Sequence, residues 1–321
     1  MLTALIVLIG GLMLLTYGAD RFVVGAAATA ANLGVPSLLV GLVIVGFATS
    51  APEMLVSAVA ALNQRPEIGI GNAIGSNITN IALVIGATAL WTPLAVGSTV
   101  VRREFPILFL VLAVAVALMW DLHLGIRDGA ILLIGLVVMI GLTVWLGRHA
   151  APDDPLRAEI EHREVSPIAP LLATLWLLFG LALLLLGSRL VVDGAVDIAA
   201  YLGLSDIVIG LTVVAVGTSL PELAASIMSA VKNEPDIALG NVIGSNMFNA
   251  LGVLAMPALL APGTFDRAVM NRDVPCMIGL SVALLLMCRA RRGRRRIGRL
   301  DGAVLLGAFV AYQVLLFADG S

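Results

Sequence analysis

The sequence is short of charged residues, which make up 12% of its 321 residues, whereas soluble domains average about 25%. Hydrophobic residues make up 60%, more than one soluble core can bury. This imbalance excludes an ordinary soluble domain and predicts many membrane spans, each of about 20 mostly apolar residues. The net charge of -2 gives no indication of a nucleic-acid partner, and we expect none.

Cysteine and histidine are also scarce, with two cysteines and three histidines. Cys276 and Cys288 lie in one apolar run, roughly 18 Å apart if the run is a helix, which is too far for a disulfide. His123, His149 and His162 fall in loops or at the ends of expected spans. We therefore expect no disulfide, no zinc or redox role and no cofactor.

One segment of the sequence occurs twice. Residues 41–80 align without a gap with 210–249, at a constant offset of 169, and eighteen of the forty pairs are identical. The shared residues include Thr, Ser, Pro, Glu and Asn, which lipid disfavours, so common helix composition does not explain the match. We infer an internal duplication.

Each copy lies in a half with five apolar segments. These segments are 2–31, 37–62, 68–90, 105–120 and 129–146 in the first half, and 169–195, 205–231, 237–260, 274–288 and 303–317 in the second. Because five is an odd number, the second half must enter the membrane from the opposite face. The expected fold is an all-α polytopic membrane protein, with ten transmembrane helices as two inverted five-helix repeats.

The predicted domains are 1–147 and 169–321, one five-helix repeat each, joined by a short charged cytoplasmic linker, 148–168. With both termini outside, the expected inner loops hold thirteen Lys and Arg residues and the outer loops hold four. Positive charge favours the inner face, so we predict a multi-pass inner-membrane protein with periplasmic termini. The arginine-rich run 289–299 fits an anchor on the lipid bilayer better than a nucleic-acid site.

Both copies carry the pattern Thr-Ser-x-Pro-Glu, followed by Gly-Asn-x-x-Gly-Ser-Asn-x-x-Asn. On a helix, residues spaced by four share a face. The pattern therefore gives four polar stripes, flanked by Ser50 and Ser219, which should face one another or a wet cavity. The stripes are Thr49, Glu53 and Ser57; Asn72, Ser76 and Asn80; Thr218, Glu222 and Ser226; and Asn241, Ser245 and Asn249.

Glu53 and Glu222 are the chemically decisive residues of these stripes. An ionised carboxylate inside a membrane costs several kcal/mol unless it is paired, and no Lys or Arg lies in the four helical cores. Two carboxylates match one divalent cation in charge, and carboxylate, hydroxyl and amide oxygens are the ligands that Ca²⁺ prefers. The motif has no soft ligands, which argues against copper or zinc.

Pro52 and Pro221 each precede one of these glutamates. Proline frees the carbonyl four residues back, so we expect broken helices whose free carbonyls line a cavity. Glycines of the motif are expected to let helices pack closely: Gly71 with Gly75, and Gly240 with Gly244. Other acidic residues fall near expected span ends, where solvated or capping roles suffice: Asp20, Asp193, Asp206 and Asp266.

The two blocks GFATSAPE with GNAIGSNITN, and AVGTSLPE with GNVIGSNMFN, closely resemble the alpha repeats of the calcium/cation antiporter superfamily. The likeness is greatest to the prokaryotic sodium/calcium exchangers, and it covers both repeats and the ten-span plan. It implies antiport of Ca²⁺ against Na⁺, or against H⁺ in some branches, by alternating access. The transported ions and the lipid bilayer are then the expected partners.

Carried over by position, the resemblance implies that Glu53 and Glu222 are the calcium carboxylates. Its other implied ligands are two threonines through their backbone carbonyls, four serines of the sodium sites and two asparagines: Thr49 and Thr218; Ser50, Ser76, Ser219 and Ser245; Asn80 and Asn249. Some sodium exchangers of this superfamily carry an aspartate at one of the asparagine positions. Two asparagines leave two formal negative charges instead of three, so proton coupling stays open.

Two other function classes share these features. A passive cation channel also uses acidic side chains to select cations, and Ca²⁺ uptake against its gradient distinguishes an antiporter from it. A membrane-embedded enzyme using Ser50 or Ser219 has no histidine near either motif. We therefore expect a transporter rather than an enzyme.

Overall fold

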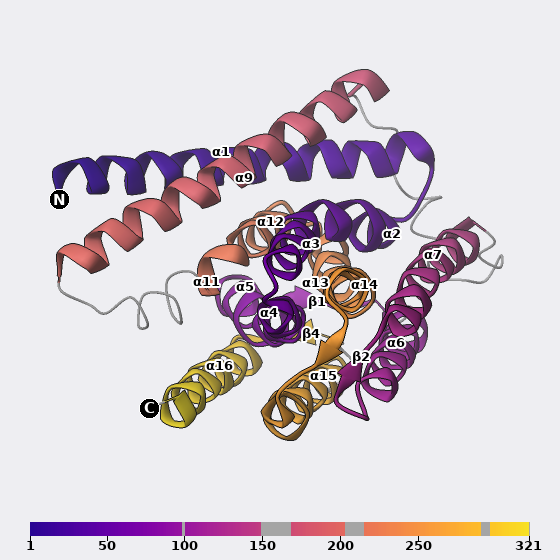
Figure 1. Cartoon of the computed structure of the whole chain (residues 1–321). Coiled ribbons are helices and arrows are strands. Elements are labelled where there is room, and N and C mark those ends of the chain that lie inside the picture. Colours follow the sequence, from indigo (N-terminus) through magenta and orange to yellow (C-terminus); the bar gives the residue numbers. More distant parts are fainter. Residues whose placement is uncertain (98–99, 149–167, 203–214, 290–295, 321) are drawn as a thin grey trace.

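The structure is a computed structural model that describes residues 1–97, 100–148, 168–202, 215–289 and 296–320. Its long helices fall into two halves of the chain (Figure 1). The spans of the first half are α1 (Leu2–Leu33); α2 (Ser37–Val40), η1 (Gly41–Val45) and α3 (Gly46–Leu62); α4 (Pro66–Thr79), η2 (Asn80–Ile85) and α5 (Gly86–Trp91); η3 (Val100–Glu104) and α6 (Phe105–Leu118); and α7 (Ile126–Arg148), where η marks a π-helical segment.

The second half repeats this order. Its spans are α9 (Pro170–Tyr201); α11 (Ala215–Thr218) and α12 (Leu220–Val231); α13 (Pro235–Phe248), η5 (Asn249–Val253) and α14 (Ala255–Leu260); η6 (Val269–Asp273) and α15 (Val274–Met287); and α16 (Arg299–Gly320). Each of the ten predicted segments coincides with helical residues, although the segment 205–231 is described only from Ala215 onward.

Eight of the described helices are long and apolar enough to cross a membrane. The fourth and ninth spans begin five residues earlier than predicted, at Val100 instead of 105 and at Val269 instead of 274. Charged residues at these helix starts made the predicted apolar segments begin too late. Most of the linker 148–168 lies outside the described residues.

Two very short antiparallel ladders join the halves, and neither was predicted. β1 (Leu94–Ala95) pairs with β4 (Arg296–Ile297), and β2 (His123–Leu124) pairs with β3 (Gly263–Thr264). In each ladder, the loop after the third span of one half pairs with the loop before the fifth span of the other. The two repeats are therefore interlocked by backbone hydrogen bonds.

α1 and α9 lie side by side across one face of the remaining helices (Figure 1). Glycines seven residues apart bring their backbones together: a Cβ added to Gly18 would lie 2.7 Å from the Leu184 nitrogen, and one added to Gly187 would clash with the Leu15 nitrogen. The same tight approach occurs at the other members of the two glycine rows: Gly11 and Gly25, and Gly180 and Gly194. Small residues permit such close packing in membranes.

α4 and α13 form the centre of the bundle. In the 18-residue apolar window of the spans Pro66–Trp91 and Pro235–Leu260, 78% and 89% of the residues are buried, whereas 28% are buried in the windows of α1 and α9. Polar residues on α4 and α13 are therefore shielded from lipid by protein, as intramembrane polar groups must be.

Close packing at Gly240 and Gly244 is confirmed. A Cβ added to Gly240 would lie 2.7 Å from the Leu38 carbonyl oxygen, and one added to Gly244 would clash with the Leu42 carbonyl oxygen. By the repeat offset, the corresponding partners of Gly71 and Gly75 fall at 207 and 211, outside the described residues. For that pair, close packing stays a prediction.

The two prolines have different effects on their helices. α3 runs through Pro52 without a break, whereas Ser219 interrupts the second copy between α11 and α12. The prediction of a broken helix is therefore wrong for the first copy, since proline removes a single backbone hydrogen bond and the flanking turns continue the helix. In the second copy, the Gly217 carbonyl accepts a hydrogen bond from the Ser188 hydroxyl at 3.0 Å.

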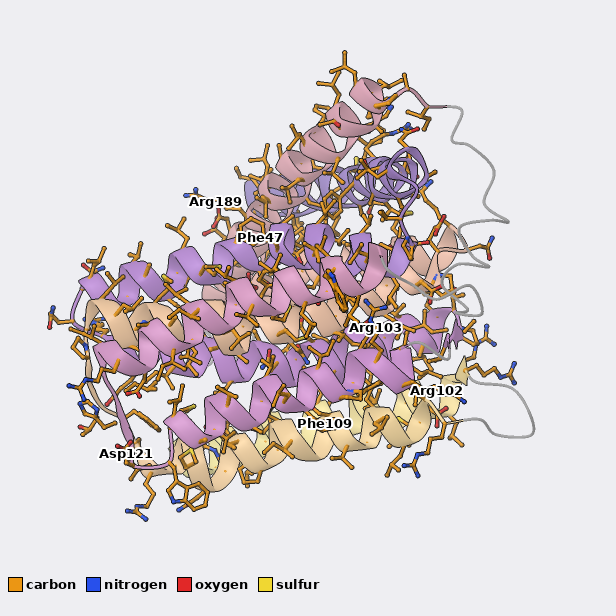
Figure 2. All side chains as sticks on the ribbon, turned by 90° about the vertical axis from the view of Figure 1, so that its right-hand side faces the viewer. Phe47, Arg102, Arg103, Phe109, Asp121 and Arg189 are labelled. Atoms are coloured by element: carbon orange, nitrogen blue, oxygen red, sulfur yellow. The ribbon has the colours of Figure 1, made fainter. Side chains whose placement is uncertain are left out.

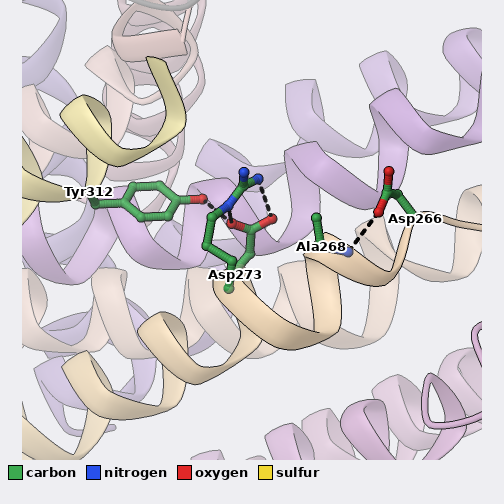
Figure 3. Close-up of polar contacts among 5 residues, drawn as sticks. Asp266, Ala268, Asp273 and Tyr312 are labelled. Atoms are coloured by element: carbon green, nitrogen blue, oxygen red, sulfur yellow. Dashed lines mark hydrogen bonds and ion pairs between the residues drawn. The ribbon is translucent and has the colours of Figure 1, made fainter. Parts of the chain in front are cut away.

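Two of the acidic residues placed near span ends lie inside helices instead. Asp20 is in α1, where Lys232 Nζ of the second half lies 2.7 Å from its carboxylate, and Asp193 is in α9. Solvated ends do not account for these two, because both helices extend well beyond them. Asp266 does cap a turn, accepting from the Ala268 nitrogen at 2.7 Å (Figure 3), and Asp206 lies outside the described residues.

Candidate functional site

The polar stripes of the two repeats meet at the centre of the bundle. The Thr49 hydroxyl of α3 donates to Asn241 Oδ1 of α13 at 3.1 Å and lies 3.3 Å from the Ser245 hydroxyl. Asn80 Nδ2 donates to Asn246 Oδ1 at 3.1 Å. These contacts connect residues 166 to 196 positions apart, so one cluster is built from both halves.

Equivalent asparagines brace the two glutamate-bearing helices. Asn72 Nδ2 donates to the Glu53 carbonyl at 3.1 Å and to the Ser57 hydroxyl at 3.2 Å. In the second copy, Asn241 Nδ2 donates to the Glu222 carbonyl at 3.3 Å and to the Ser226 hydroxyl at 3.0 Å. The same side chains therefore fix each glutamate backbone in a matching position, as expected for a duplicated site.

Glu53 and Glu222 are buried at this centre, with 2% and 1% of their surface exposed. The helices that carry them, α3 and α12, contact each other within the bundle. Neither takes part in an ion pair with a Lys or Arg of the described residues, and one carboxylate oxygen of each has no hydrogen-bond partner there. The two acids therefore lie near each other and away from lipid, without a protein cation to neutralise them.

Three more of the predicted residues carry a buried oxygen atom without a described hydrogen-bond partner: Ser50, Asn80 and Asn249. Thr49, Ser76, Ser219 and Ser245 are buried beside them, whereas Thr218 is half-buried. Buried polar atoms are normally hydrogen-bonded. A group of unpaired oxygens, each able to accept and two of them on acids, is the environment that a bound cation satisfies.

A cavity of about 620 Å³ reaches this centre between α3, α9, α11 and α12. Glu53, Pro52, Thr218 and Pro221 lie on its inner wall. Two charged residues of α9, Arg189 and Asp193, line it further out. The cavity connects one of the buried acids with more exposed parts of the protein.

The structure adds a second pair of buried acids that sequence reasoning missed. Glu104 and Asp273 occupy equivalent positions, at the repeat offset of 169, and each follows an arginine at the start of a span. Arg103 Nε lies 3.5 Å from Glu104 Oε1, and Arg272 Nε donates to Asp273 Oδ1 at 2.7 Å. The shared pattern Arg-acid-x-Pro, present in both halves, was the available signal.

The two acids differ in their further partners. Tyr312 donates its hydroxyl to Asp273 Oδ1 at 3.0 Å (Figure 3), whereas Glu104 Oε2 has no hydrogen-bond partner among the described residues. The position equivalent to Tyr312 is Thr143, whose shorter side chain donates to the Met139 sulfur at 3.8 Å. These acids have arginine partners, unlike Glu53 and Glu222, and therefore need no bound cation.

Comparisons with known proteins agree with the duplicated helical architecture. The family model described as "Sodium/calcium exchanger protein" matches residues 3–145 and 172–318, which are almost all of both halves. The chain is 50% identical to the "Putative antiporter CaxA" of Alkalimonas amylolytica over 99% of its own length and 100% of that protein. It is 39% identical to the "Inner membrane protein YrbG" of Escherichia coli (strain K12), over 99% and 98% of the two chains.

Solved structures of the sodium-calcium exchanger NCX_Mj have the same fold. One of them, soaked without Na⁺ and Ca²⁺, superposes with a TM-score of 0.82 at 34% identity, covering 96% of this chain and 97% of that one. This match confirms the predicted ten-helix fold of two repeats. With matches of this extent to the family model and to the relatives, the chain belongs to the sodium/calcium exchanger family, within the calcium/cation antiporter superfamily.

Proposed function

We propose that this protein is a secondary antiporter that exchanges Ca²⁺ for Na⁺ by alternating access. The observation that carries the proposal is the pair of buried acids, Glu53 and Glu222, one from each repeat, with unpaired oxygens and without a described basic partner. Leaving two such charges unneutralised inside a membrane is costly. A divalent cation between them removes the cost. Membership of an exchanger family supports transport rather than enzymatic chemistry.

The proposed Ca²⁺ ligands are the oxygens that lack other partners. Glu53 and Glu222 supply the charge, and Ser50, Asn80 and Asn249 supply neutral oxygens. Ca²⁺ takes six to eight oxygen ligands, so backbone carbonyls of Thr49 and Thr218 and water complete the shell. The sodium sites add the remaining serines of the motif: Ser76, Ser219 and Ser245.

Competition for one carboxylate pair makes the exchange obligatory. Ca²⁺ and the counter-ion cannot neutralise Glu53 and Glu222 together, so occupancy alternates between them. When no cation is bound, two charges remain buried without neutralisation. This cost disfavours the change between the state open to one face of the membrane and the state open to the other. The α1–α9 layer, which packs over the bundle, is the element that we propose to slide and to change the face from which the centre is reached.

Sodium is the proposed counter-ion, and protons are the alternative. Asn80 and Asn249 are both neutral, so the centre has two formal negative charges to share among several sodium ions. If protons replace sodium, Glu53 or Glu222 itself carries the proton. The name of the Escherichia coli relative supports an inner-membrane location, and the distribution of basic residues supports periplasmic termini.

The decisive experiment measures ⁴⁵Ca²⁺ uptake into proteoliposomes that contain the full chain. An outward Na⁺ gradient and an outward H⁺ gradient are imposed separately, with the membrane potential clamped. We expect the Na⁺ gradient to drive Ca²⁺ accumulation above equilibrium, which a passive channel cannot do. Accumulation driven by H⁺ alone would replace the sodium coupling with proton coupling.

Substitutions locate the transported ions. Glu53→Gln and Glu222→Gln should each abolish uptake, because one carboxylate cannot neutralise a divalent ion. Glu67→Gln is the matched control, since Glu67 is an exposed acid in the first turn of α4. Retention of uptake in either site variant, with Glu67→Gln unchanged, would refute the assignment of the centre.

A further inference from the structure

Arg189 and Asp193 place two charges inside a membrane-crossing helix. Both lie within the apolar span Pro170–Ile198 of α9, one turn apart. Arg189 Nε is 3.9 Å from Asp193 Oδ2, and their side chains are 83% and 59% exposed. An ion pair this loose and exposed contributes little to stability, so mutual pairing does not account for two charges at this position.

The cavity beside α9 places these charges near one of the buried acids. Arg189 and Asp193 both line it, and so does Glu53, whose Oε2 has no hydrogen-bond partner among the described residues. Figure 2 labels Arg189 on α9 and Phe47 on α3, the helix that also carries Glu53. One continuous space therefore connects the exposed charged pair with the buried acid.

The walls of this cavity are otherwise largely apolar. Beside Arg189, Asp193 and Glu53, the described lining includes aliphatic residues such as Leu55, Leu185 and Val192. Apolar walls of low dielectric concentrate the field of the few charges between them. A cation in the cavity is therefore attracted by Asp193 and repelled by Arg189 before it reaches Glu53.

We infer that Arg189 and Asp193 act as an access pair that sets the rate at which cations reach the centre, without binding them as ligands. The negative charge of Asp193 raises the local concentration of Ca²⁺ in the cavity. The positive charge of Arg189 limits this increase, because it partly cancels the charge of Asp193. Ionisable residues inside membrane helices mark ion pathways for this reason. The inference rests on the proposed function, because it assumes that Ca²⁺ binds at Glu53.

The access pair has no equivalent in the first half. The corresponding positions in α1 are Asp20 and Val24, and Asp20 is paired with Lys232 at 2.7 Å. The two repeats therefore differ at these two positions. We expect the access pair to act on Ca²⁺ supplied from one face of the membrane and not on Ca²⁺ supplied from the other.

The test measures initial ⁴⁵Ca²⁺ uptake against Ca²⁺ concentration at low ionic strength, in vesicles of each orientation. Asp193→Asn should raise the KM by about threefold or more and Arg189→Gln should lower it, in line with electrostatic steering. The maximal rate should be unchanged. The change should shrink at high salt, which screens exposed charges, and Asp193→Glu should restore the original KM.

Asp197→Asn is the matched control, because Asp197 is exposed on α9 one turn further along and does not line the cavity. Its KM should equal that of the unaltered protein. An unchanged KM in both Asp193→Asn and Arg189→Gln, or a loss of maximal rate alone, would overturn the access pair while leaving the centre intact. Absence of Ca²⁺ transport in the unaltered protein, under any gradient, would overturn the proposed function as well.

Discussion

Asp273 shows how a buried charge is retained in this protein. Its carboxylate accepts from Arg272 at 2.7 and 3.1 Å and from the Tyr312 hydroxyl at 3.0 Å. Hydrogen bonds to charged groups contribute about 1.5–3 kcal/mol to stability. The neighbouring helices η6 and α16 are thus held together by one carboxylate.

Tyr312→Phe should therefore destabilise the protein by about 1.5–3 kcal/mol, because it removes one of these bonds and leaves a buried oxygen less well satisfied. Thermal unfolding of the purified protein in detergent measures the effect. The equivalent position in the first half gives the control: Thr143→Val should have a smaller effect, since the Thr143 hydroxyl only contacts a sulfur atom. Equal effects of the two substitutions would contradict this account.

Asn249 tests how the charge of the centre controls the counter-ion. Asn249→Asp adds a third carboxylate among oxygens that have no described partner, and it should lower the Na⁺ concentration that half-saturates Ca²⁺ release. ⁴⁵Ca²⁺ efflux against external Na⁺ measures this. Asn63→Asp adds the same charge at an exposed residue and should change nothing. An unaltered Na⁺ dependence in Asn249→Asp would exclude this position from the sodium sites.

At the scale of elements, the two glycine rows determine how α1 and α9 pack. Gly18→Ala would place its Cβ 2.7 Å from a backbone nitrogen of Leu184, so the helices must separate and the melting temperature should fall. Gly10→Ala is the control on the same helix, because no atom lies within 4 Å of its Cβ. Its higher helix propensity should stabilise the protein slightly, by up to about 1 kcal/mol. Equal melting temperatures of the two variants would count against glycine-mediated packing.

The sequence predicted the helices best where composition and the spacing of polar residues indicate the same helix. The repeated blocks placed Glu53 and Glu222 on helices that do meet, because residues spaced by four must share a face. The starts of the fourth and ninth spans were missed, because Glu104 and Asp273 look unfavourable for a membrane unless each is known to pair with the arginine that precedes it. The position of Asp20 depends on Lys232, 212 residues later, and local patterns carry no information about such a contact.

At the scale of the whole molecule, the two repeats depend on each other. Each half supplies one of the two acids of the centre, and Thr49 and Asn80 make hydrogen bonds to the opposite half. Cutting the chain within the linker 148–168 should therefore leave two fragments that are inactive alone. Their coexpression should restore Ca²⁺ uptake, measured in membrane vesicles and compared with the uncut protein. Uptake by either fragment alone would show that one half contains a complete centre.

The ladder between Leu94–Ala95 and Arg296–Ile297 has a consequence for biosynthesis. Leu94–Ala95 emerges from the ribosome early, whereas Arg296–Ile297 emerges shortly before the last helix. The early loop must therefore remain without its final backbone partners until almost the entire chain has been translated. Maturation of the first repeat is thus a late event, completed by nearly the last residues to be synthesised.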